Sequence, residues 1–251
     1  MPDDERHVTD AVRGVVRWHE LRTSDPAAAV AFYPALFGWT IQERGHRTEF
    51  RLGATPVAAL HRVTPGTPPA WLPVIEVDDL DDAADRVASE EGQITVSPAD
   101  HLDLPGRVGL VTHPIAGEFG LMEPAGGLPP LPDAPAPGGG REDPGRFGWH
   151  ELESPDPSAA AAFLRNVVGW TSTAGLLRDR SGRTVAGVVE AVDGTPAHWL
   201  SFVVVPDLAE IVRRTTELGA LVVVPRTTIA SGAAACVIRD HDGVTLGCLQ
   251  R

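Results

Sequence analysis

The sequence of 251 residues contains no lysine, so all 21 of its basic residues are arginine. This absence excludes a Schiff base on a lysine amine, and it excludes a P-loop, whose lysine contacts nucleotide phosphates. The 34 acidic residues outnumber the basic ones, and the formal net charge is −13. Because nucleic-acid binding requires clustered cations, we expect that nucleic acid is not a partner.

Cysteine and long apolar runs are also scarce. The only two cysteines, Cys236 and Cys248, cannot build a disulfide framework and lack the spacing of metal ligands. No apolar run approaches the ~20 residues of a membrane-spanning helix, and residues 1–13 lack the apolar segment of a secretory signal. We therefore expect a reduced cytoplasmic protein with no membrane partner.

The chain contains two copies of one sequence pattern. Each copy opens on Trp-His-Glu-Leu, reaches Asp-Pro seven residues after its Trp, and continues through an alanine-rich segment to Gly-Trp-Thr. All six tryptophans fall into matched pairs, which are Trp18 with Trp149, Trp39 with Trp170, and Trp71 with Trp199. We infer a tandem duplication from this repeated order.

The segment between the copies, residues 124–145, holds seven prolines and six glycines without apolar periodicity. Such a composition favours an extended, exposed linker, because proline lacks an amide donor and glycine has no side chain to bury. The expected organisation is a polar tail over 1–13, a first domain over 14–123, this linker over 124–145, and a second domain over 146–251.

Each copy is predicted to contain a strand, a helix and three strands, followed by the same order once more. Asp25 and Asp156, each followed by proline, are typical helix N-caps. Gly38 and Gly169 are typical of the residue that ends a helix. The chain is therefore expected to hold four βαβββ units and to belong to the α+β class.

This pattern resembles the vicinal oxygen chelate superfamily of glyoxalase I, bleomycin-resistance proteins and extradiol dioxygenases. The first strand with its Asp-Pro, the helix over 31–39 and Asp-His-Asp-Gly-Val-Thr-Leu over 240–246 carry the resemblance. More narrowly, the chain is similar to tandem-domain actinobacterial members with Trp-x-Glu-Leu on both first strands. The resemblance implies two glyoxalase-like domains with a cup each, paired as an intramolecular pseudo-dimer, in a monomer or a homodimer.

Metal-dependent members of this superfamily bind a divalent ion through His, Gln or Glu at four strand positions per site. At three of those positions, both copies carry side chains that do not ligate metal: Trp18, Trp149, Leu72, Leu200, Gly120 and Gly247. Because a divalent ion needs several converging O or N ligands, we expect no metal site of the ordinary kind and no other cofactor. His61 and Glu190 are expected at matching positions of the two copies, just beyond the fourth ligand position. The alternative is a one-residue shift of the first strand, which would turn His19 and His150 inward beside them.

The first strands carry the candidate binding residues. If both tryptophans point into the cups, the alternation of side chains along a strand also directs Glu20, Arg22 and Glu151 inward. An indole offers a stacking surface and a carboxylate accepts hydrogen bonds, which suits a small hydrophobic or aromatic ligand. The predicted ligand-binding residues are Trp18, Glu20, Arg22, Leu72, Trp149, Glu151 and Leu200. The opposing interpretation is that the tryptophans fill the cups as packed cores.

Our leading functional hypothesis is a metal-independent small-molecule-binding protein of the glyoxalase/bleomycin-resistance type, serving antibiotic resistance or a natural-product pathway. A second hypothesis is a lyase, isomerase or cyclase that uses Glu20, Glu151, His61 or Glu190 for acid–base catalysis. A carboxylic acid buried beside an indole has a raised pKa and becomes a proton donor near neutrality. A third hypothesis is a metal-dependent glyoxalase-like or dioxygenase-like enzyme with a divalent metal at a displaced site.

Overall fold

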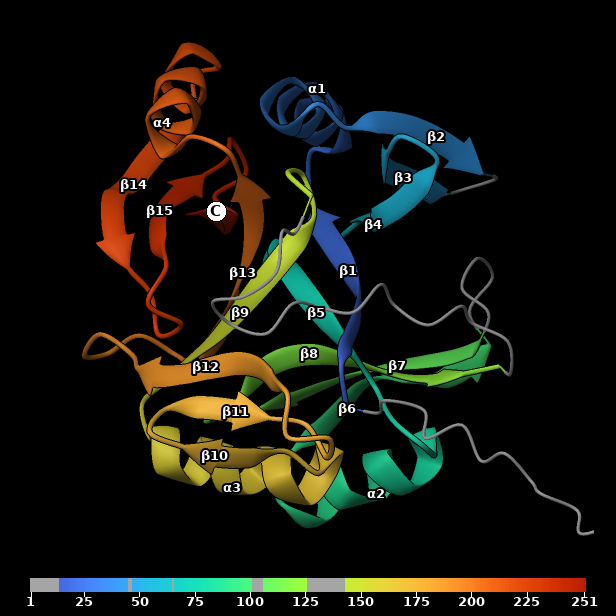
Figure 1. Cartoon of the computed structure of the whole chain (residues 1–251). Coiled ribbons are helices and arrows are strands. Elements are labelled where there is room, and N and C mark those ends of the chain that lie inside the picture. The colour runs from blue at the N-terminus through green and yellow to red at the C-terminus, as the bar shows by residue number, and fades with distance from the viewer. Residues whose placement is uncertain (1–13, 45–46, 65, 101–105, 126–142) are drawn as a thin grey trace, which may run out of the picture.

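The computed structural model describes residues 14–44, 47–64, 66–100, 106–125 and 143–251 (Figure 1). The predicted N-terminal tail, 1–13, and most of the predicted linker, 126–142, lie outside the described residues. Within the described ranges, no helix combines the length and the apolar composition that crossing a membrane would require.

Each sequence copy forms one eight-stranded sheet. The strands of the first sheet are β1 (Val16–Thr23), β2 (Thr40–Arg44), β3 (Arg47–Leu52), β4 (Thr55–Arg62), β5 (Ala70–Glu76), β6 (Gln93–Asp100), β7 (Gly106–His113) and β8 (Gly117–Pro124). Those of the second sheet are β9 (Phe147–Ser154), β10 (Thr171–Thr173), β11 (Leu176–Arg178), β12 (Thr184–Glu190), β13 (His198–Val205), β14 (Leu221–Thr228), β15 (Ala234–Arg239) and β16 (Thr245–Gln250).

The two sheets have the same strand order, β2-β3-β4-β1-β5-β8-β7-β6 and β10-β11-β12-β9-β13-β16-β15-β14. In each sheet the first strand lies in the centre, parallel to the last strand of its own unit and antiparallel to the first strand of the next unit. The predicted α+β class and the four βαβββ units in two tandem glyoxalase-like domains are therefore confirmed.

The four helices begin and end at signals that the sequence contains. They are α1 (Pro26–Phe37), α2 (Leu80–Ser89), α3 (Pro157–Val168) and α4 (Leu208–Glu217). Asp25 and Asp156 cap α1 and α3 by accepting the backbone N–H of the third residue on, with proline in the first helical turn. Gly38 and Gly169 end these helices in the left-handed conformation, with φ of 73° and 78°.

The two domains pair through their helices and share their cores. Figure 1 shows α1 beside α4 and α2 beside α3, and the central strands lie between the two helix pairs. Each of the two largest hydrophobic clusters takes side chains from both domains. The Trp39 indole donates to the carbonyl of Gly145 at 2.7 Å, and the Trp170 indole donates to that of Gly14. The expected intramolecular pseudo-dimer is therefore present.

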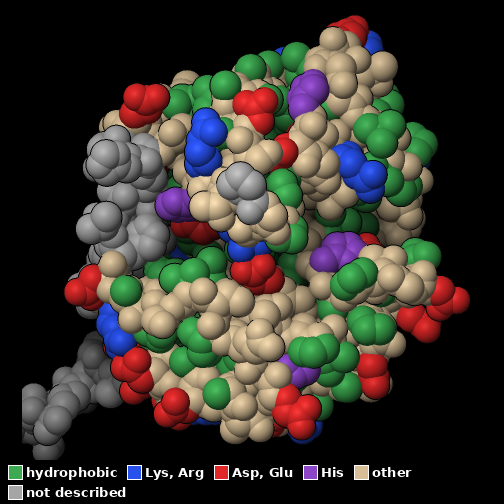
Figure 2. Space-filling view, turned by 180° about the vertical axis from the view of Figure 1, so that it is seen from behind, with side chains coloured by type: hydrophobic (Ala, Val, Ile, Leu, Met, Phe, Trp, Pro, Cys, Tyr) green, Lys and Arg blue, Asp and Glu red, His purple; other side chains and the backbone are tan. Residues whose placement is uncertain are grey.

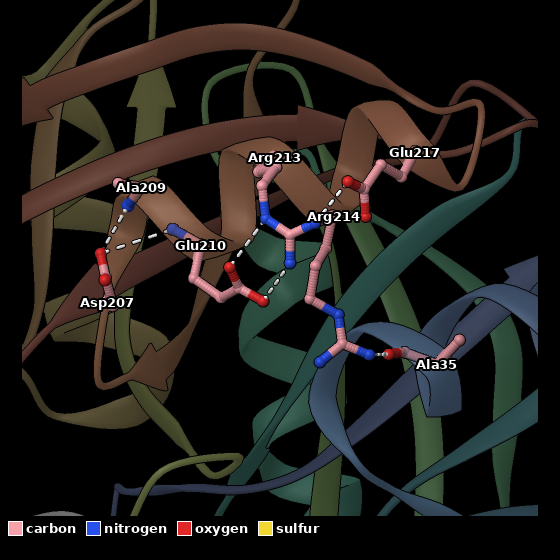
Figure 3. Close-up of polar contacts among 7 residues, drawn as sticks. All are labelled: Ala35, Asp207, Ala209, Glu210, Arg213, Arg214 and Glu217. Carbon is pink, nitrogen blue, oxygen red and sulfur yellow. Dashed lines mark hydrogen bonds and ion pairs between the residues drawn. The ribbon is translucent and has the colours of Figure 1, made fainter.

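Helix α4 illustrates how this pairing is held (Figure 3). Asp207 caps the helix by accepting the N–H groups of Ala209 and Glu210. Arg213 is occupied by Glu210 and Glu217 on the exposed face of α4. The neighbouring Arg214 instead reaches across the domain boundary and donates to the carbonyl of Ala35 at the end of α1. The last turn of one helix is thus tied to the other domain.

Candidate functional site

The face of each sheet that carries the first Trp-x-Glu pair is the candidate site. We call this face cup 1 where it carries Trp18 and Glu20, and cup 2 where it carries Trp149 and Glu151. In cup 1 the Trp18 indole donates to Glu20 Oε1 at 2.7 Å, and in cup 2 the Trp149 indole donates to Glu151 Oε1 at 3.1 Å. The indole and the carboxylate therefore lie side by side, as alternation along the strand predicts.

The intervening histidines lie on the opposite face, between the domains. The ring of His19 stacks on Phe147 with centroids 3.6 Å apart and lies 5.1 Å from the ring of His150. Burial holds the pKa of His19 well below its usual value, with a smaller contribution from His150, and lowers the pKa of His150 to about 3. The one-residue shift that would turn both histidines into the cups is therefore absent, and both are neutral packing residues.

Cup 1 contains an acid–base pair. His61 Nε2 lies 2.8 Å from Glu20 Oε2, and the two residues come from neighbouring parallel strands, β4 and β1. The Glu20 side chain is 7% exposed, whereas the His61 side chain is 45% exposed. The buried carboxylate thus contacts a histidine whose side chain is about half-exposed. Figure 2 shows histidine, acidic and basic side chains close together in a recess across the middle of the face in view.

Two ion pairs surround this dyad. Arg22 donates through both terminal nitrogens to the Glu118 carboxylate, at 2.6 Å each, and so connects β1 to β8. Arg51 donates to Glu49 at 2.8 Å on β3. The apolar part of the cup is small and consists of Trp18, Ala59, Val74 and Met122, with the partly buried Val108 against them. Leu72, another predicted binding residue, lies opposite Glu20 on β5 and is buried.

Cup 2 is filled by its own side chains. Its apolar cluster contains Trp149, Leu200, Phe202, Val204, Ile229, Ala235 and Leu249. Ala230, in the loop after β14, donates its backbone N–H to Glu151 Oε1 at 2.6 Å, so this loop lies over the carboxylate. Burial raises the pKa of Glu151, although the hydrogen bonds from Ala230 and Trp149 oppose that shift. The interpretation of the cup as a packed core therefore describes cup 2.

The expectation that Glu190 is the counterpart of His61 is wrong by one residue. His61 lies opposite Arg22, and in the second sheet Val189 lies opposite Glu153, which occupies the position of Arg22. Glu190 is exposed and lies one position further along, opposite Ser154. The reason is that the second copy is three residues shorter between its second and third tryptophans. Counting along the two copies in this segment therefore does not pair structurally equivalent residues.

The residues at the superfamily's metal positions do not fit a divalent ion. Trp18, Leu72 and their counterparts carry no side-chain atom that ligates metal. On the last strands, a Cβ at Gly120 would lie 2.8 Å from a Val74 methyl carbon, and one at Gly247 would lie 2.1 Å from the Phe202 ring. Neighbouring side chains thus occupy the space from which a ligand would extend. Across the described ranges, no group of three or more His, Cys, Asp or Glu could hold a metal.

Two features of the site were not found from the sequence. Glu118, the partner of Arg22, lies 96 residues away, and no motif marks it. Ala230 acts through its backbone N–H, which has no side-chain signal. An inward arginine near an apolar wall does indicate that some acidic partner exists, because a buried guanidinium needs one. Its identity depends on strand order, which brings β8 beside β5 and close to β1.

Comparisons with known proteins agree with this architecture. Residues 11–114 match the profile of the Glyoxalase/Bleomycin resistance protein/Dioxygenase superfamily. "Putative glyoxylase CFP32" of Mycobacterium bovis is 28% identical over an alignment 257 positions long, gaps included, which covers 95% of this chain and 95% of that protein. "Anthracycline biosynthesis protein DauV" of a Streptomyces species is 28% identical over an alignment 269 positions long, gaps included, which covers 91% of this chain and 90% of that protein.

Solved structures share the fold at lower identity. The Mn(II)-bound glyoxalase from Novosphingobium aromaticivorans aligns with a TM-score of 0.65 at 14% identity. The alignment covers 95% of this chain and 83% of that one. At this level of identity, the likeness extends to the arrangement of the strands and not to the contents of the cups.

Proposed function

Because the chain belongs to the Glyoxalase/Bleomycin resistance protein/Dioxygenase superfamily, we propose that it binds a planar aromatic small molecule in cup 1 and does so without a metal ion. The observation that carries this proposal is the composition of cup 1, where an indole and an acid–base pair stand in place of metal ligands. A ligand site of this kind combines an apolar wall with a few placed polar groups. Cup 2, filled by Phe202 and Ile229, is proposed to be structural.

The class of ligand follows from the wall and from one relative. Trp18 is the only aromatic side chain in the apolar cluster of cup 1, and an indole face favours a flat partner that can stack on it. DauV is named for the biosynthesis of anthracyclines, which are planar polycyclic aromatic compounds. This name supports a polycyclic ligand and, with it, a role in a natural-product pathway or in resistance to such a compound.

The test uses an anthraquinone methyl ether as a probe, with the methoxy group at the β ring position, away from the carbonyls. Isothermal titration should give binding by the wild-type chain and about tenfold weaker binding by Trp18→Phe, because the smaller ring loses stacking area and the bond to Glu20. The matched variant Trp149→Phe should keep the wild-type affinity. Equal losses in both variants, or none in either, would contradict the assignment to cup 1.

Metal independence is tested on the same protein. Chain purified without chelator and chain treated with EDTA should bind the probe equally well. If elemental analysis finds a stoichiometric divalent metal, and if EDTA abolishes binding that the metal restores, the alternative of a displaced metal site is correct instead.

An acid–base enzyme is the second candidate function, and one contact favours it. Of the four acid–base candidates, only Glu20 and His61 are brought together, with 2.8 Å between Oε2 and Nε2. Glu151 lies beneath Ala230, and Glu190 is exposed on the other side of its strand. A lyase, isomerase or cyclase activity would therefore be confined to cup 1.

A further inference from the structure

We propose that Cys236 and Cys248 form a site of reversible oxidation, where a low-molecular-weight disulfide such as oxidised glutathione converts the two thiols into one cross-strand disulfide. Both side chains belong to the large cluster shared by the two domains, on the face of the second sheet opposite cup 2. The site is separate from cup 1, so the inference does not depend on the ligand proposed there.

The only two cysteines of the chain lie directly opposite each other. Cys236 on β15 and Cys248 on β16 are register partners on antiparallel strands. Residues in this relation have Cα atoms about 4.5–5.5 Å apart. A disulfide joins Cα atoms that are about 4.4–6.8 Å apart. A bond between the two sulfur atoms therefore requires little movement of the backbone.

The two thiols differ in acidity. Hydrogen bonding with the Cys248 side chain lowers the pKa of Cys236. Burial raises the pKa of Cys248 well above its usual value. Because the thiolate is the form that attacks a disulfide, we expect Cys236 to react first and Cys248 to complete the bridge.

Strand β14 is weakly held beside Cys236, although both thiols are buried. It is the edge strand of the second sheet, and none of its side chains is fully buried (Figure 1). Its register with β15 shifts between Val224 and Thr227. Pro225 and Arg226 therefore both stand opposite Cys236, as in a β-bulge, and proline has no N–H to donate to β15. Local opening of such an edge gives a small disulfide access to Cys236.

The oxidation balances with the external disulfide as its only co-reactant. The Cys236 thiolate attacks one sulfur of that disulfide, whose S–S bond breaks as a mixed disulfide forms and one small thiolate leaves. The Cys248 sulfur then attacks the Cys236 sulfur, which forms the bridge and releases the second small thiolate. The two protons of the cysteines end on the two released thiols, so the cysteines are oxidised and the external disulfide is reduced.

The first domain has no such pair. On the last strands, Leu121 corresponds to Cys248, because each is aligned with the same position of the neighbouring parallel strand. The register partner of Leu121 is Gly109, which therefore stands at the position of Cys236. The same strand pair thus folds without cysteine in the first domain, so the architecture alone does not require the two thiols.

The bridge would fix a hairpin that contacts the first domain. In the turn between β15 and β16, Asp240 accepts the hydroxyl of Tyr33 at 2.8 Å, and Asp242 accepts that of Thr23 at 2.7 Å. Tyr33 and Thr23 belong to the first domain. A disulfide between the two strands of this hairpin therefore adds a covalent link next to a contact that joins the domains.

The experiment measures whether the fold favours the disulfide. The full chain is equilibrated with mixtures of reduced and oxidised glutathione, both folded in buffer and unfolded in urea. The remaining thiols are alkylated after an acid quench, and the mass of the intact chain gives the number of alkyl groups. We expect the equilibrium constant for disulfide formation to be about tenfold larger, or more, in the folded chain, because the register holds the thiols together. Dithiothreitol should restore both thiols.

The variants test the order of reaction and the route of access. Cys248→Ala should stop at a mixed disulfide with one glutathione, whereas Cys236→Ala should react more slowly because its remaining thiol is less acidic. Val224→Ala should speed the oxidation by loosening β14 beside the bulge. Val223→Ala, at an exposed position of the same strand, is the matched control and should keep the wild-type rate.

The outcomes separate the disulfide from simple packing of two small side chains. The proposal is overturned if the folded chain keeps both thiols in every glutathione mixture, or if its equilibrium constant does not exceed that of the unfolded chain. A disulfide between two chains, seen as a doubled mass, overturns it as well. Equal rates in Val224→Ala and Val223→Ala refute the route through β14. None of these outcomes bears on ligand binding in cup 1, which has its own test.

Discussion

Cup 1 and cup 2 share the Trp-x-Glu pair of their first strands, yet ion pairs line cup 1 whereas apolar side chains fill cup 2. The residues opposite the shared pair account for the difference. His61 in cup 1 corresponds to Val189 in cup 2, and Val74 corresponds to Phe202. Ile229 and Ala230 then close cup 2 over Glu151. Duplication preserved the strand order while the two cups came to hold different kinds of groups.

This contrast shows that the same motif has different chemistry in different surroundings. Both glutamates accept a hydrogen bond from an indole two residues earlier. In cup 1 the second carboxylate oxygen meets a half-exposed histidine, whereas in cup 2 the carboxyl group is covered and its pKa is raised by burial. The sequence motif alone would assign both glutamates the same role. The strands around them distinguish the glutamate that contacts a half-exposed histidine from the glutamate that is covered by a loop.

The largest expected effect is a loss of fold stability in acid, and it arises at the interface between the two domains. His19 and His150 are buried there, and burial lowers the pKa of each, that of His150 to about 3. Such a histidine contributes its full stabilisation above the unfolded-state pKa of 6.5 and loses it as the pH falls towards the folded-state value. Two pH units below 6.5, we expect His150 to lose about 3 kcal/mol of stabilisation, and His19 to change stability in the same direction.

Denaturant unfolding at neutral pH and near pH ~4.5 measures this loss. The variant His150→Asn removes one titrating ring and should recover the part of the acid-dependent decrease that His150 causes, about 3 kcal/mol. His241→Asn, at an exposed histidine, is the control and should not change the pH dependence. An acid dependence that is the same in His150→Asn as in the wild-type chain would show that the buried rings do not cause it.

The next effect compares the packing of the two cups at matching glycines. In cup 2, Gly247→Ala places its Cβ against three atoms of the buried Phe202 ring and should destabilise the fold by about 1–3 kcal/mol. In cup 1, Gly120→Ala meets the methyl groups of Val74 at 2.8 Å, against 2.1 Å for the contact at Gly247, and should cost less. Thermal unfolding of both variants tests the order. A larger loss for Gly120→Ala would mean that cup 1 is the more tightly packed.

The smallest expected effect on stability concerns Glu151, whose carboxyl group lies under the loop after β14. Because the pKa of Glu151 is raised in the folded state, its contribution to stability is present at low pH and falls as the pH rises through the folded-state pKa. Glu151→Gln removes this titration and keeps an oxygen for Ala230 and Trp149. We expect the variant to be as stable as the wild-type chain or up to ~1 kcal/mol more stable at neutral pH. A clear loss of stability at neutral pH would show that the ionised form is needed.

Much of the fold could be predicted from local signals. Asp-Pro and glycine mark the ends of α1 and α3, because capping depends only on neighbouring residues. The alternation of side chains along β1 also depends only on neighbouring residues, and it correctly placed Trp18 and Glu20 on one face. The matched tryptophans indicated the duplication, and the identical strand orders of the two sheets reflect it.

The contents of the cups were harder to predict because they depend on strands that are distant in the sequence. The Arg22–Glu118 pair requires β8 to lie near β1, and the cover over Glu151 is a backbone N–H. The register error at Glu190 came from a difference in copy length that moves one strand relative to its repeat. Nothing local to these residues reveals which glutamate lies beside a half-exposed histidine and which lies under a loop.

The most direct test of the account uses fluorotryptophan-labelled chain and fluorine NMR, with each resonance assigned by a Trp→Phe variant. Titration with the anthraquinone methyl ether should shift the Trp18 resonance and leave the Trp149 resonance unchanged, because the ligand is proposed to bind in cup 1 and the loop after β14 covers Glu151 in cup 2. A shift of the Trp149 resonance, with or without one at Trp18, would contradict the claim that cup 2 is closed and cup 1 alone takes the ligand.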